Sequence, residues 1–136
     1  MELSAKDGDL VLLRATDADI EVFGEGPFRL LAGELREASL AARAFRAVGG
    51  VYYSDPGMSA RANTVVASAD GEMQLEGAAE RPVELELREA GFTDDGEVSA
   101  QRIRFKEGEL FASGGVSARL QRGGERVELE AATLQA

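Results

Sequence analysis

Apolar and polar residues alternate along most of the chain, in short stretches separated by glycine-containing turns. Residues 83–87 (Val-Glu-Leu-Glu-Leu) and 127–131 (Val-Glu-Leu-Glu-Ala) have an apolar side chain at every second position. The same alternation occurs at 18–22, 103–105 and 116–120. Side chains of a β-strand point alternately to its two faces, so this pattern predicts strands with one buried face.

Turn-forming residues separate these stretches. Glycine next to a polar residue or a second glycine supplies the positive φ that tight hairpin turns need. We expect tight turns at Asp70-Gly71, Asp94-Asp95-Gly96, Glu107-Gly108 and Gly123-Gly124, and looser turns at Gly26-Pro27 and Pro56-Gly57. Short strands with regular turns favour a sandwich, barrel or open β-roll.

Residues 34–48 permit two interpretations. Their many Ala, Leu, Glu and Arg residues are good helix formers, so the segment could be a helix of three or four turns. Alternation at Leu40, Ala42 and Ala44 instead indicates strands. We favour strands, because the segment leads into Gly49-Gly50-Val51, which belongs to a recurring motif.

That motif is a strand that reaches a glycine, bends, and is followed by another strand. Residues 110–116 (Leu-Phe-Ala-Ser-Gly-Gly-Val) resemble 45–51 (Phe-Arg-Ala-Val-Gly-Gly-Val), and 71–78 resemble 108–115. A strand–turn–strand unit of this kind cannot bury its apolar face alone, so such units stack. Glycine at each bend lets two sheets fold toward each other. The sequence thus predicts one all-β domain, residues 1–136, built of repeated strand–turn–strand units.

The repeated pattern, a tight turn followed by Leu-x-x-Gly-x-Val and later by Leu-x-Ala, resembles the OstA-like β-jellyroll family. These are the periplasmic lipopolysaccharide-transport proteins of the Lpt A and C type. The best matches are 99–132 and 60–87, with a weaker copy at 45–53. The resemblance implies an antiparallel β-jellyroll in which two sheets form a V, the "β-taco", that shelters the acyl chains of lipopolysaccharide. It also implies edge-to-edge pairing with other β-jellyroll transport proteins.

If the interior is a lipid groove, the apolar faces of the alternating strands should line it. Ligand binding then needs little polar recognition, because each buried methylene contributes about 0.8 kcal/mol. For any one of these residues, a place in a closed core is an equally good interpretation. The candidates are Met73, Leu75, Val83, Leu85, Leu87, Ile103, Phe105, Leu110, Val116, Leu120, Val127 and Leu129.

Composition removes several classes of function. The formal net charge of -10 disfavours nucleic-acid binding, because the surface repels phosphate. The chain has no Cys and no His, and therefore no thiol nucleophile, imidazole base or common zinc ligand. The acidic runs at 94–97 and 17–19 lack the spacing of an EF-hand calcium loop. We expect no enzyme activity, no catalytic residue, no cofactor and no metal.

Charged groups and strand edges offer two other kinds of contact. Arg102, Arg104 and Lys106 alternate with Ile103 and Phe105, so we expect these cations to face solvent rather than a lipid phosphate. Strands near 10–15 and 127–134 lie toward the ends of the chain. They contain little that would block pairing with another chain.

We therefore expect a lipid-binding bridge domain that carries lipopolysaccharide or a related amphiphile toward the outer membrane. The alternative is a structural β-scaffold that assembles into homo-oligomers through its edge strands, without a ligand. The resemblance implies the periplasm. No apolar run approaches the roughly 20 residues of a membrane span, and the first residues lack a signal-peptide pattern. Whether a membrane anchor was removed stays open.

Overall fold

The computed structural model describes residues 2–6, 9–23, 27–39, 44–90 and 93–136, and every regular element within them is a β-strand. All pairings are antiparallel and join the strands into one sheet. The strands are β1 (Glu2–Lys6), β2 (Asp9–Val22), β3 (Phe28–Ser39), β4 (Ala44–Ser54), β5 (Met58–Ala67), β6 (Met73–Glu76), β7 (Val83–Ala90), β8 (Thr93–Ala100), β9 (Arg102–Lys106), β10 (Glu109–Arg122) and β11 (Glu125–Gln135). The predicted all-β class is confirmed.

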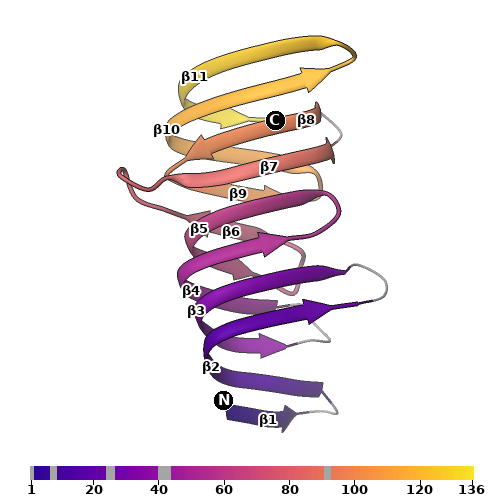
Figure 1. Ribbon diagram of the computed structural model, residues 1–136, viewed down its shortest axis with the longest axis vertical. Coiled ribbons are helices and arrows are strands. Elements are labelled where there is room, and N and C mark those ends of the chain that lie inside the picture. Colours follow the sequence, from indigo (N-terminus) through magenta and orange to yellow (C-terminus); the bar gives the residue numbers. More distant parts are fainter. Residues whose placement is uncertain (1, 7–8, 24–26, 40–43, 91–92) are drawn as a thin grey trace.

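The long strands curve around one side of the molecule, so that their two halves lie in two layers (Figure 1). Strand β5 shows the arrangement, because its first half (58–61) pairs with β7 and its second half (64–67) pairs with β6. We name the layer with β7 and β8 the first layer, and the layer with β6 and β9 the second layer. The strands are stacked nearly in chain order, from β1 at one end to β11 at the other (Figure 1).

Pairs of glycines make the bends in β4 and β10. Gly49 and Gly50 have φ values of 80° and 78°, and Gly114 and Gly115 have values of 83° and 66°. The register with the neighbouring strand shifts at both places, as in a β-bulge. Ala112 and Val116, four residues apart on either side of the bend, are both buried. The apolar face of the strand therefore continues through the bend. The repeated Gly-Gly-Val motif of the sequence lies at this bend in both strands.

Backbones come close together along the line of bends. A Cβ atom on Gly33 would lie 2.6 Å from the Gly49 carbonyl oxygen, and one on Gly77 would lie 2.5 Å from the Arg81 carbonyl oxygen. Near the bends the regular strand structure is also interrupted, between β6 and β7 and between β8 and β9. Strands β5 and β10 cross both layers and pair with these shorter strands. As a result β5, β6, β9, β10, β8 and β7 form a closed ring.

Most predicted turns are confirmed, and one prediction was wrong. Hairpin turns lie at Pro56-Gly57, Asp70-Gly71, Glu107-Gly108 and Gly123-Gly124. Asp94, Asp95 and Gly96 instead lie inside β8, where Gly96 pairs with Leu87 of β7 and Leu120 of β10. Gly96 is buried, and β8 lies between its two partner strands. A turn at this position would break the pairing with both of them. Gly26 lies outside the described residues.

Residues 34–48 are strands wherever the structure describes them. β3 continues to Ser39, and β4 begins at Ala44. Tertiary pairing overrides the helix propensity of the segment, since β3 pairs with β2 on one side and with β4 on the other. Residues 40–43, which include Leu40 and Ala42, lie outside the described residues.

The predicted edge strand is wrong at one end of the sheet and confirmed at the other. The segment 10–15 is not the edge, because β1 precedes it and pairs with β2. At the other end β11 pairs with β10 alone among the described strands, as predicted for 127–134. The short alternating pattern of β1 was overlooked, which moved the predicted edge by one strand.

Candidate functional site in the apolar interior

The space between the two layers is filled by small and medium-sized aliphatic side chains. The buried set runs from Ala18 on β2 to Ala118 on β10 and forms one cluster. None of the described buried polar side-chain atoms lacks a hydrogen-bond partner. The interior is therefore apolar along its length, as the alternating pattern predicted.

The residues predicted to line a groove are distributed unevenly between core and surface. Seven of them are buried: Leu75, Val83, Leu85, Leu87, Ile103, Leu110 and Val116. Four more are half-buried against the core: Met73, Phe105, Leu120 and Leu129. Val127 on β11 is 50% exposed. All seven buried residues are at most 2% exposed and belong to one core cluster.

An apolar cavity of about 110 Å³ lies elsewhere, between the layers at β2, β3 and β4. The first layer contributes Ile20, Val22, Phe28 and Leu30, and the second layer contributes Leu35, Ala38, Ser39, Ala44 and Phe45. Ser39 carries the only side-chain heteroatom among these lining residues, and none of them is ionisable. Phe23, at the end of β2, is 79% exposed.

The lining determines what the cavity can hold. A polar group moved from water into such a space would lose its hydrogen bonds, whereas a hydrocarbon chain gains about 0.8 kcal/mol for each buried methylene. Each layer supplies alternate residues of its strands, such as Phe28 and Leu30 of β3. The described lining of the cavity therefore suits an apolar chain.

These cavity residues were not among those predicted from the sequence to line a groove. The alternation at 18–22 was recognised, but the lining was assigned to the C-terminal repeats, where the motif is best preserved. The signal that could have found them is the spacing of Phe28 and Leu30 on one strand face, opposite Phe45 after the bend. Cavities cannot be predicted from alternation, because a filled and an unfilled interior have the same pattern.

Arg102, Arg104 and Lys106, which we name the basic ladder, lie on the outer face of the second layer, and the last two are paired with carboxylates. Arg104 Nε is 3.6 Å from Glu72 Oε1, and its guanidinium lies 4.8 Å from the centre of the Phe111 ring. Lys106 Nζ is 3.2 Å from Asp70 Oδ2. Ile103 is buried on the opposite face. The outward orientation predicted for these cations is thus confirmed for the strand.

Asp70 gives this ladder a testable pH dependence. The backbone N–H of Glu72 donates to Asp70 Oδ1, and Lys106 donates to Oδ2, and these contacts hold the pKa of Asp70 below its usual 3.8. A carboxylate with a lowered pKa in the folded state stabilises that state above the unfolded pKa, and the stabilisation is lost as the pH falls through the folded pKa.

We therefore expect Asp70→Asn to lower the free energy of unfolding slightly near neutral pH and to have no effect in strong acid. Denaturant titrations of both proteins across the acid range measure this difference. A difference that does not change with pH would contradict the proposed contribution of the charge.

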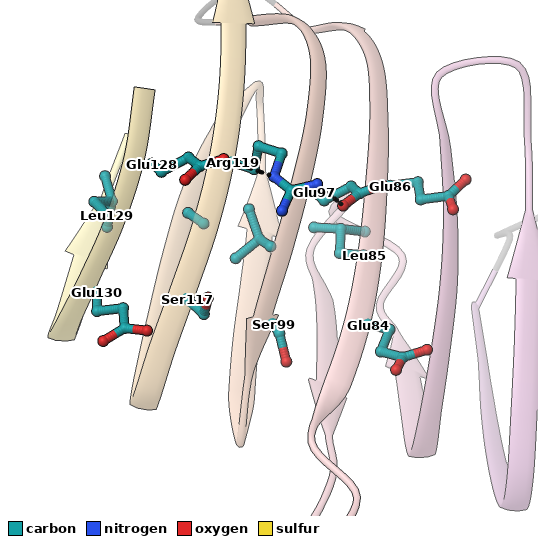
Figure 2. Close-up of a pocket in the computed structure, with 12 residues that line it drawn as sticks. Glu84, Leu85, Glu86, Glu97, Ser99, Ser117, Arg119, Glu128, Leu129 and Glu130 are labelled. Atoms are coloured by element: carbon teal, nitrogen blue, oxygen red, sulfur yellow. Dashed lines mark ion pairs between the residues drawn. The ribbon is translucent and has the colours of Figure 1, made fainter. Parts of the chain in front are cut away.

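A shallow trough of about 750 Å³ lies on the outer face of the first layer, over β7, β8, β10 and β11. Arg119 lies at its centre, 3.3 Å from Glu128 and 3.9 Å from Glu97 (Figure 2). Glu84, Glu86 and Glu130 surround this group. The carboxylates outnumber the single cation, so the trough disfavours anionic head groups. Its side chains are exposed, and surface ion pairs contribute little to stability.

Within the described residues, no three acidic side chains are placed to hold a metal ion. The same part of the chain contains no helix long and apolar enough to cross a membrane. No protein-family model matches the sequence, and no curated protein matches it significantly.

Proposed function

We propose that this chain is a lipid-binding domain that shelters an acyl chain of lipopolysaccharide, or of a related amphiphile, during transport to the outer membrane. The observation that carries the proposal is the cavity between the two layers at β2, β3 and β4, where none of the described lining residues has an ionisable side chain. Binding there removes hydrocarbon from water without any covalent chemistry. Such a role needs no cofactor, and its site is the periplasm that lipopolysaccharide crosses.

We also propose that the fold is a V-shaped β-jellyroll built of repeated strand–turn–strand units. Three features support this. The two layers are halves of the same long strands (Figure 1). The bends recur at Gly49-Gly50 and Gly114-Gly115 with positive φ. The strands β2, β3, β4 and β5 pair in chain order, and each of them adds to both layers.

We propose a ligand site at the N-terminal strands β2 to β4 instead of the C-terminal strands that the sequence suggested. The predicted lining on β7, β9 and β10 is closely packed, and separating it to admit a chain would cost the contacts of Leu85, Ile103 and Leu110. The cavity at β2 to β4 already offers space. We therefore place the acyl chain against Ile20, Leu30 and Phe45 first.

Native mass spectrometry tests this function, with lipopolysaccharide and with a single-chain fatty acid as separate probes. Ile20 is half-buried and lines the cavity, so Ile20→Gln should weaken binding about tenfold or more by placing an amide in apolar space. Leu129→Gln is the matched control, since Leu129 is half-buried on β11 outside the cavity. Absence of a lipid adduct with both probes would contradict the proposal.

A structural scaffold is the second candidate, and the free edge of β11 favours it. Val127 is 50% exposed, and Leu129 and Leu134 are only half-buried, so the apolar interior is incompletely covered at this end. A second copy could pair with this edge and cover it. If oligomers form without lipid, and if Val127→Lys prevents their formation, the scaffold is favoured over the carrier.

A further inference from the structure

Three aromatic side chains stand side by side at one end of the cavity. Phe28 lies 5.8 Å from Tyr53 and 6.3 Å from Phe45, and Phe45 lies 6.4 Å from Tyr53, measured between ring centres. The three ring pairs are inclined by only 23° to 28°. We name this group the aromatic wall.

The wall reaches from one layer to the other. Phe28 begins β3 and Tyr53 is near the end of β4, both in the first layer, whereas Phe45 is in the half of β4 that belongs to the second layer. Phe28 and Phe45 line the cavity, and Tyr53 does not. Tyr53 is fixed from its far end, because its hydroxyl group donates to Asp55 Oδ2 at 2.7 Å.

Closed core lies behind the wall. On β5, the next strand after β4, Met58, Ala60 and Val65 are at most 5% exposed. Beyond them the buried residues of β6 to β10 continue the core. The wall therefore separates the cavity at β2 to β4 from the packed interior.

We propose that the aromatic wall limits the length of the hydrocarbon chain that the domain accepts, and that the site takes one chain at a time. This rests on the lipid-binding function proposed above. The cavity, about 110 Å³, is smaller than the cavity of about 150 Å³ that holds one benzene molecule, so it has room for the end of a single chain. A chain that enters between the two layers from the β2 side stops at Phe28 and Phe45, because their stacked rings stand across the space between the layers. Additional acyl chains of a multi-chain lipid stay outside the cavity.

A series of saturated fatty acids from octanoic to stearic acid, with affinities measured by calorimetry, tests the wall. Phe45→Ala should shift the preferred chain to one longer by about two to four carbons, because truncating a buried aromatic ring leaves a cavity. Phe45→Leu is a milder variant that keeps most of the packing, and it should shift the preference in the same direction. Leu110→Ala is the matched control, since Leu110 is fully buried on β10, away from the wall.

The outcomes separate this inference from the function on which it rests. A longer preferred chain in the two Phe45 variants, with the wild-type preference kept in Leu110→Ala, supports the wall. Fatty-acid binding with the same preference in all four proteins overturns the wall and leaves the lipid-binding function standing. Binding of one fatty-acid molecule per domain supports the site for one chain, and binding of two or more molecules per domain with similar affinity overturns it. No binding of any fatty acid by the wild-type protein overturns both proposals.

Discussion

Gly114→Ala is expected to destabilise the domain by about 2–5 kcal/mol. Two costs add at this position. The backbone has a φ of 83°, and a left-handed conformation costs a residue with a Cβ roughly 1–2 kcal/mol. The new Cβ would also lie 2.7 Å from the Cβ of Gln101, and overpacking of this kind costs about 1–3 kcal/mol. Urea denaturation of the two proteins measures the difference.

Gly115→Ala is the matched control for this change. Gly115 also has a positive φ, of 66°, but a Cβ there would meet nothing within 4 Å. We therefore expect only the backbone cost, about 1–2 kcal/mol. Equal losses of unfolding free energy in the two variants would show that the close approach of the new Cβ to Gln101 adds no cost at Gly114.

Leu75→Ala should destabilise the domain by about 2–5 kcal/mol. Leu75 is fully buried on β6, so the smaller side chain would leave a cavity in the core. Its unfolding free energy in urea and its affinity for a fatty acid should be measured on the same preparation.

Val127→Ala is the comparison for Leu75→Ala, because both residues were predicted to line the same groove. Val127 is 50% exposed, so its truncation should change the free energy of unfolding by less than about 0.5 kcal/mol. If Leu75→Ala instead left stability unchanged and reduced lipid affinity, Leu75 would line the ligand site, and the site would extend beyond the aromatic wall.

The strands and their inward faces could be predicted because burial on one face requires alternation. The pattern at 83–87 and 127–131 gave β7 and β11 directly. The paired glycines were also readable, since Gly49-Gly50 and Gly114-Gly115 recur in similar surroundings. The family implied by this repeat, and its ligand, stay predictions.

The errors have two physical causes. Asp94-Asp95-Gly96 has the composition of a turn, but pairing with β7 and β10 places it in a strand, and sequence alone does not show these partners. The cavity was missed because it depends on how side chains from two layers fill the space between them. Ile20 and Leu85 have the same pattern along the chain, yet Ile20 lines the cavity and Leu85 is packed.

The stacking of strands in chain order has a consequence for folding. Most strands pair with the strand that precedes or follows them, and the hairpins between them are short. Most pairings therefore join strands that are neighbours in the chain, which costs less chain entropy than joining distant segments. Such a chain can gain structure hairpin by hairpin from any starting point, as repeat proteins do. Removing β11 would then expose β10 as a new edge without undoing the pairings between β1 and β5.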